Sequence, residues 1–146
     1  MDVKITKVLK HALDEDNLNS QLFMDLFREW KQIGEFNSYG FGKDSAYFKP
    51  CVGGKQYVLR HVHLVPVFDR TQLSKWNKSW QFKSRKTSNR VLIYVDDGKG
   101  GFLLIYILSE PDAHDVALMR TQKHKELMEG FAKVAEAFVF DGSVIA

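Results

Sequence analysis

The sequence contains one cysteine, Cys51, so it cannot form an internal disulfide, a scarcity that is typical of proteins in a reducing compartment. No apolar run approaches the roughly 20 residues that a membrane-spanning helix needs. The first eight residues also lack the apolar core of a secretory signal. We therefore expect a cytoplasmic protein that has no membrane partner.

Several signatures of cofactor and nucleophile chemistry are missing as well. The sequence has no glycine-rich phosphate loop and no Gly-x-Ser-x-Gly elbow around a serine nucleophile. No cysteine or acid lies at a usual metal-ligand spacing from the histidines at 61 and 63. We therefore expect a site that uses no nucleotide cofactor, no metal and no other cofactor.

Acidic residues are absent from residues 70–90, which hold seven Lys or Arg residues. The whole chain has a net charge of only +3, and outside this stretch 14 basic residues stand against 18 acidic ones. Trp76, Trp80 and Phe82 are interleaved with the cations. Because cations contact phosphates and flat rings stack on bases, this composition is typical of single-strand RNA binding. The alternative is a solvated surface loop whose tryptophans pack onto the core.

Apolar residues make up 45% of the chain, enough for one domain, residues 1–146, with a core that needs no disulfide or metal. Their periodicity predicts secondary structure. The predicted strands cover residues 3–8, 55–67, 91–95 and 102–108. The predicted helices cover about 18–33 and 115–138, and the predicted loops cover 34–54 and 68–90, the latter a basic loop or insert. The order strand, helix, strand, hairpin and helix is typical of an α+β fold.

Each predicted helix has an apolar stripe that we expect to face the core. In the first helix the stripe consists of Leu18, Leu22, Leu26 and Trp30, at i, i+4, i+8 and i+12, and it is widened by Phe23, Phe27 and Ile33. In the second it consists of Leu127, Phe131, Val134, Ala135 and Phe138.

The strand predicted at 55–67 carries two histidines on one face. His61 and His63 are two residues apart and share a face, whereas Arg60 points to the opposite face. The pair could be metal ligands, hydrogen-bonded structural residues, or acid–base groups on the open face of a sheet. Histidine titrates near neutral pH and suits the last of these roles.

The helix predicted after the hairpin begins with a polar turn. Residues 120–126 include no apolar side chain, and Arg120, Lys123 and His124 would cluster on one helical face. His114 lies in the polar corner just before this helix. The strand, the corner and the turn could therefore converge on one cleft.

A set of histidines and cations of this kind suits metal-independent RNA cleavage. One imidazole would take the proton of a ribose 2′-OH, another would protonate the leaving 5′-oxygen, and cations would stabilise the phosphate. We expect His63 or His61 to be the base and His124 or His114 to be the acid, with Arg60, Lys123 and Lys125 as phosphate partners.

Six short motifs follow one another between residues 41 and 138. They are Phe41-Gly42-Lys43-Asp44, Arg60-His61-Val62-His63-Leu64, Tyr106-Ile107-Leu108, Pro111-Asp112-Ala113-His114, His124-Lys125 and Ala135-Glu136-Ala137-Phe138. In this order, and with ten residues from His114 to His124, the chain resembles the YafO-type toxins of bacterial type II toxin–antitoxin systems. It departs from them in its longer and more basic stretch at 68–90.

This resemblance implies a small cytoplasmic endoribonuclease that cuts mRNA on the translating ribosome and is neutralised by a cognate antitoxin. It also implies an α+β fold of the RelE/ParE group, a small antiparallel sheet packed with N-terminal and C-terminal helices. The alternative function is a non-enzymatic RNA- or ribosome-binding module that uses the basic aromatic stretch. The candidate RNA-contacting residues are Lys43, Arg60, Lys75, Trp76, Lys78, Trp80, Lys83, Arg85, Lys86, Arg120, Lys123 and Lys125.

Overall fold

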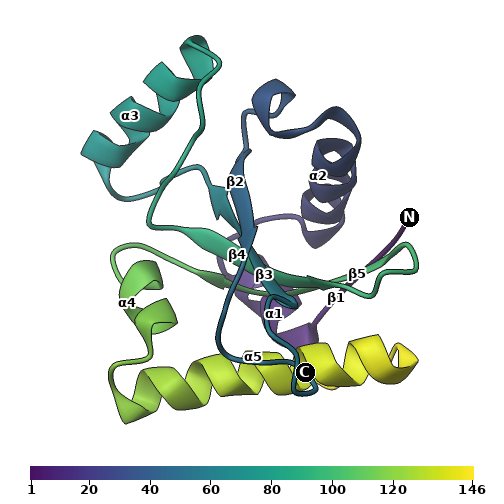
Figure 1. Ribbon diagram of the computed structural model, residues 1–146. Coiled ribbons are helices and arrows are strands. Elements are labelled where there is room, and N and C mark those ends of the chain that lie inside the picture. The colour runs from purple at the N-terminus through teal and green to yellow at the C-terminus, as the bar shows by residue number, and fades with distance from the viewer.

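The computed structural model describes residues 1–146 as a five-stranded sheet between two layers of helices (Figure 1). The strands are β1 (Asp2–Ile5), β2 (Phe41–Ala46), β3 (Leu59–Leu64), β4 (Val91–Asp96) and β5 (Gly101–Leu108), in the order β1-β5-β4-β3-β2. The predicted α+β class is confirmed. The sheet is mixed rather than wholly antiparallel, because the edge strand β1 runs parallel to β5.

Five α-helices and one short 3-10 helix complete the fold. The α-helices are α1 (Lys7–Glu15), α2 (Ser20–Ile33), α3 (Arg70–Gln81), α4 (Ala113–Leu118) and α5 (Gln122–Asp141), and η1 is Glu35–Asn37. Polar side chains cap four of the starts, since Thr6, Asn19, Asp69 and Thr121 each accept a hydrogen bond from the first turn of the helix that follows. None of the helices combines the length and the apolar character needed to cross a bilayer.

The hairpin β4–β5 lies close to where the apolar runs predicted it, but other boundaries differ. The expected loop at 34–54 contains β2, whose sequence has no β-branched residue and therefore gives little strand signal. The expected basic loop contains α3. The helix predicted at 115–138 is two helices, because Met119 adopts a left-handed conformation (φ 52°) and Thr121 starts α5 afresh. Another helix, α1, occupies the region assigned to the end of the first strand.

Two apolar cores lie on the two faces of the sheet. On β4, Leu92 and Tyr94 point toward α1 and α2, whereas Val91, Ile93 and Val95 point toward α4 and α5. All five side chains are buried, because β4 is a central strand covered by helices on both faces (Figure 1). The continuous apolar run of the sequence reflects this two-sided burial.

The stripe predicted for the first helix is confirmed only in part. Phe27 and Trp30 are the buried residues of α2, whereas Leu18, Leu22 and Leu26 are exposed. Phe27 lies within 6.2 Å, between ring centroids, of the aromatic rings of the sheet and of α2 that surround it. These rings bury more apolar area per residue than leucine does, so they determine which face of α2 packs inward.

In the second predicted stripe, Phe131, Ala135 and Phe138 are buried as expected, whereas Leu127 is exposed and Met128 takes its place in the core.

A polar cluster crosses the sheet on the α2 side. The hydroxyl of Tyr94 donates to Asp44 (2.7 Å) and accepts from Arg60 (3.1 Å) and Lys31 (3.1 Å). Arg60 also donates to Asp44 at 3.0 Å. The cluster joins β2, β3 and β4 to α2, and it satisfies the only polar group of a fully buried side chain of β4.

We expect Tyr94→Phe to lower the free energy of unfolding by about 1–3 kcal/mol, because the substitution removes the hydrogen bonds that Asp44, Arg60 and Lys31 make with the Tyr94 hydroxyl. Urea denaturation measures this change. Tyr106→Phe is the matched control, since the Tyr106 hydroxyl makes no hydrogen bond in the chain and the ring only stacks on Phe131. Equal effects of the two substitutions would contradict a stabilising role for the cluster.

Candidate active site

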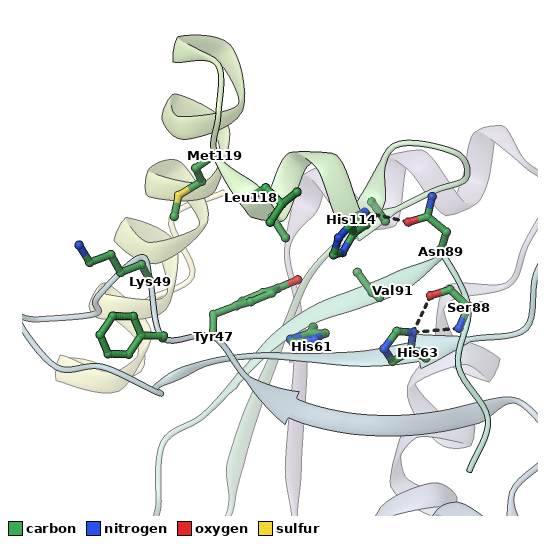
Figure 2. A pocket seen from close by; sticks show the side chains of 13 residues that line it. Tyr47, Lys49, His61, His63, Ser88, Asn89, Val91, His114, Leu118 and Met119 are labelled. Atoms are coloured by element: carbon green, nitrogen blue, oxygen red, sulfur yellow. Dashed lines mark hydrogen bonds between the residues drawn. The ribbon is translucent and has the colours of Figure 1, made fainter. Parts of the chain in front are cut away.

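An open cleft of about 500 Å³ lies between β3, the segment before β4, and α4 (Figure 2). Three of the four predicted acid–base histidines line it: His61 and His63 from β3 and His114 from α4. Figure 2 shows His63 beside Ser88 at one end and Lys49 at the other, with His61 between them and His114 on the opposite wall. The three imidazoles therefore come from two segments that are far apart in the sequence.

His61 occupies the centre of the cleft floor. Its Nε2 lies 3.1 Å from Ser45 Oγ, and its ring stacks on Tyr47 with 4.0 Å between centroids. Its Nδ1 is buried and has no hydrogen-bond partner in the protein. Burial, together with a smaller effect of the neighbouring His63, lowers the pKa of His61 to about 4. The side chain is therefore neutral at pH 7.

His63 is held through one ring nitrogen. Its Nδ1 lies 2.6 Å from the carbonyl oxygen and 3.0 Å from the amide nitrogen of Ser88, so it can donate to the first or accept from the second. In either tautomer the Ser88 backbone engages Nδ1 and leaves Nε2 free. Burial lowers the pKa of His63, and the Ser88 hydrogen bond partly offsets that effect. The ring is fixed in orientation by a backbone contact.

His114 is exposed and is positioned by its backbone. Its amide donates to Asn89 Oδ1 at 2.8 Å, while the Asn89 side chain also donates to the carbonyl of Pro111. The backbone N–H of Asn89 donates to the side-chain carbonyl of Gln72 on α3 at 2.8 Å. Asn89 thus links the start of α4 to α3 across the cleft. Asn89 could not be identified from the sequence, because an isolated Asn gives no motif.

Tyr47 is the second cleft residue that sequence reasoning missed. Its ring covers His61, and its hydroxyl points into the space between His61 and His114 (Figure 2). Burial raises the pKa of this hydroxyl well above its usual range, so the hydroxyl remains a proton donor at neutral pH. It lies just beyond β2, a strand that the sequence pattern did not predict.

A polar groove of about 410 Å³ continues the cleft toward α3. The groove and the cleft share His63, Ser88, Asn89 and His114, and the groove adds the exposed Lys75. It has no apolar lining residue. A polyanion that lies in this groove would reach the histidines from the α3 side.

The polar turn at 120–126 does not form a wall of the cleft. His124, Arg120 and Lys123 line neither the cleft nor the groove, although all three were predicted as site residues. The prediction required one continuous helix, but Arg120 lies in the break between α4 and α5 and so does not share a helical face with the other two. Lys125 lines a separate hollow that adjoins the cleft.

Several predicted RNA contacts are structural. Trp76 is 0% exposed and Lys86 is 1% exposed, so neither can stack on a base or contact a phosphate. The Lys86 ammonium donates to the carbonyls of Glu35 (2.8 Å) and Ser38 (2.5 Å). Arg60 belongs to the polar cluster on the opposite face of β3.

Other cations of the basic stretch are also engaged within the protein. Lys83 donates to the carbonyl of Phe36 and lies 4.7 Å from the centroid of the half-buried Trp80 ring, while Arg85 pairs with Glu35 at 3.2 Å. Lys75 and Lys78 remain exposed and make no ion pair within 4 Å. The free positive charge of this stretch is therefore smaller than its composition suggests.

Lys43 lies on β2 and does not line the cleft, but its charge lowers the pKa of both His61 and His63. No group of three or more His, Cys, Asp or Glu side chains is arranged to hold a metal ion.

A family model described as "Toxin YafO, type II toxin-antitoxin system" matches residues 28–140. The matched part includes the whole cleft, the groove and most of the sheet. No curated protein and no solved structure matches the chain.

The pKa of His61 predicts a pH-dependent stability. The unfolded chain binds this proton near pH 6.5, whereas the folded chain binds it only near pH 4, so the unfolded state takes up the proton first as the pH falls. The free energy of unfolding should therefore decrease between pH 7 and pH 5, by about 2 kcal/mol from this one group. Urea denaturation at the two pH values measures the decrease.

His61→Gln should reduce this loss by about 2 kcal/mol relative to the wild type. His11→Gln is the control, because His11 is exposed on α1 and pairs with the exposed Glu15. A His61→Gln variant that loses as much stability as the wild type would show that His61 is not the group responsible.

Proposed function

The chain belongs to the YafO family of toxins of type II toxin–antitoxin systems, and from this premise we propose that it is an endoribonuclease that cleaves mRNA on the ribosome. The observation that carries the proposal is the cleft in which His61, His63 and His114 come together, with a polar groove that leads to Lys75. Imidazoles in one water-accessible cleft are suited to proton transfer, and a neighbouring cation is suited to phosphate binding.

The reaction that fits these groups is an attack of a ribose 2′-oxygen on the adjacent phosphorus. A base removes the 2′-OH proton, a new O–P bond forms, and the bond from phosphorus to the 5′-oxygen breaks. An acid donates a proton to the leaving 5′-oxygen. The products are a 2′,3′-cyclic phosphate and a 5′-hydroxyl end, and the chemistry needs no group beyond the side chains and the RNA.

His63 is the best candidate for the base. Its Nδ1 is engaged by the Ser88 backbone, which leaves Nε2 to accept a proton, and burial lowers its pKa so that the ring is neutral at pH 7. His114, on the opposite wall, is the candidate for the acid because it is exposed and faces the same space (Figure 2). His61 lies beside His63 on the cleft floor, and its Nδ1 has no partner in the protein.

The crowded phosphate of the transition state needs hydrogen-bond donors and positive charge. The Tyr47 hydroxyl points into the cleft and keeps its proton, so it can donate to a phosphate oxygen. Lys75, in the groove, can contact a neighbouring phosphate of the same strand. These two residues take the roles that the sequence analysis gave to Arg60 and Lys123.

Family membership also supports a cognate antitoxin as the protein partner and translation as the process that the toxin inhibits. The alternative of a non-enzymatic RNA-binding module depends on the basic stretch. It is weakened because Trp76 and Lys86 are buried and because Lys83 and Arg85 contact the η1 region. Lys75 and Lys78 would have to provide that binding.

We expect His63→Ala to reduce RNA cleavage by about 10²–10⁴-fold, the usual contribution of a positioned general base. Growth arrest after induced expression and mapping of RNA 5′ ends measure the effect, and the wild type should produce 5′-hydroxyl ends. His114→Ala should behave similarly. His124→Ala is the matched control and should remain fully toxic, because His124 lies outside the cleft.

Two outcomes would reject the assignment. If His61, His63 and His114 can each be replaced without loss of toxicity, the cleft is not the site of chemistry. If His124→Ala abolishes toxicity while the cleft variants do not, the site lies near the start of α5. Mapping RNA ends with and without a translation block tests the ribosome requirement, since ribosome-dependent cuts should disappear under the block.

A further inference from the structure

Two exposed aromatic rings stand together at one end of the cleft. Phe48 and Tyr57 belong to the segment between β2 and β3, and their ring centroids are 5.6 Å apart. Phe48 lines the cleft and is 50% exposed, while Tyr57 is 60% exposed. Large aromatic side chains usually bury their faces, so an exposed pair beside a cleft indicates a surface that binds something flat.

The backbone at Tyr57 adopts a strained conformation that fixes where its ring lies. Tyr57 has a φ of 62°, a conformation that a bulky side chain rarely adopts, and its amide donates to the carbonyl of Tyr47 at 3.0 Å. Between the two rings, the chain turns back through Gly53 and Gly54, with Val52 paired to Lys55. A strained residue that presents an exposed ring is typical of a functional position.

A hollow rich in lysine lies next to the rings. It measures about 630 Å³ and shares Lys49, Leu118 and Met119 with the cleft, so the two are continuous. Lys125 and Lys133 of α5 also line it, about two helical turns apart on the same face, together with Glu129 and Glu136. None of the three lysines makes an ion pair within 4 Å.

We propose that Phe48 and Tyr57, together with Lys49, Lys125 and Lys133, form a subsite for an unpaired nucleotide of RNA beside the histidine cleft. The rings stack on a base, and the ammonium groups contact the phosphates that follow it. A base within a duplex is already stacked on its neighbours and cannot reach the rings, so the subsite selects a single strand. This inference rests on the proposed function, because it identifies the form in which RNA enters the same site.

The subsite differs from the basic stretch that the sequence indicated. The aromatic residues there include the buried Trp76 and the half-buried Trp80, which contacts Tyr39 and Lys83. Phe82 is exposed, but it lines none of the hollows that connect with the cleft. Only the segment between β2 and β3 brings exposed rings, unpaired lysines and the histidines to one continuous surface.

Binding of a labelled single-stranded RNA of about 12 nucleotides, measured by fluorescence anisotropy, tests the role of the rings. Phe48→Ala should weaken binding about 5- to 150-fold, the range for loss of one base–aromatic stack, and Phe48→Trp should retain it. Phe82→Ala is the matched control, since Phe82 is at least as exposed as Phe48 but lies elsewhere, and it should bind as the wild type does. Wild-type binding by Phe48→Ala, or an equal loss in Phe82→Ala, would overturn the proposal.

Tyr57→Gly separates binding from folding. Glycine adopts a positive φ without strain, so the thermal midpoint should stay the same or rise while RNA binding weakens. A variant that folds as well as the wild type and binds RNA equally tightly would show that the Tyr57 ring has no part in the subsite. A purely structural role of Tyr57 would lower the midpoint and leave binding by the folded fraction unchanged.

The salt dependence of binding tests the lysines. The double variant Lys125→Gln and Lys133→Gln should reduce the slope of log affinity against log salt by about 1.4, because two phosphate contacts with a single strand are lost. Lys10→Gln with Lys99→Gln is the control, since both lysines are exposed and Lys99 lies in the turn after β4, at the end of that strand away from the cleft. An unchanged slope in the first variant would reject the lysine contacts.

The binding assays and the cleavage assays fail independently. A wild type that binds single-stranded RNA through Phe48 but never cuts it would contradict the proposed endoribonuclease and leave the subsite supported. A chain that cuts RNA at its histidine cleft, but whose Phe48→Ala variant binds and cuts normally, would reject the subsite alone. A duplex of the same sequence should bind more weakly than the single strand, and tighter duplex binding would also reject it.

Discussion

The alternation of side chains along β3 separates the residues that pack under α2 from the histidines that face the cleft. Arg60 and Val62 face α2, whereas His61 and His63 face the cleft beside α4, because successive residues of a strand point to opposite sides. A shift of register by one residue would bury the histidines under α2 and expose the arginine. The hydrogen bonds from Arg60 and Tyr94 to Asp44 connect three neighbouring strands, so they stabilise the register that keeps the histidines on the open face.

The cations of the basic stretch also fall into two groups, those that contact the rest of the protein and those that remain exposed. Seven cations without an acid suggested a surface for RNA, but Lys83, Arg85 and Lys86 hold α3 and the segment after it against the η1 region. This attachment depends on a close approach, because Gly42 has no side chain and lets the Lys86 carbonyl and the Trp76 ring come against β2. A methyl group at Gly42 would lie 2.3 Å from that carbonyl oxygen. Part of the positive charge is therefore engaged in contacts within the protein, whereas Lys75 remains exposed in the groove beside the cleft.

Residue patterns predicted the elements that are buried on both faces better than those at the edges. The runs at 91–95 and 102–108 are long, apolar and bounded by glycines, and they form β4 and β5. β2 is short and polar, so nothing in its composition distinguishes it from a loop. On α2, two apolar faces competed, and the aromatic contacts of Phe27 with the sheet decided between them. Such a choice depends on what the helix meets across the core.

The α+β class, the shared face of His61 and His63, and the family can be inferred from the residues alone, because alternation and motif order are local properties of the chain. That His114 joins these two histidines while His124 does not follows from the three-dimensional packing. That distinction depends on the left-handed Met119, which ends α4, so that α5 starts afresh at Thr121 and His124 does not line the cleft. Tertiary packing likewise buried Trp76 and left Phe48 and Tyr57 exposed, since burial depends on neighbours that are distant in sequence.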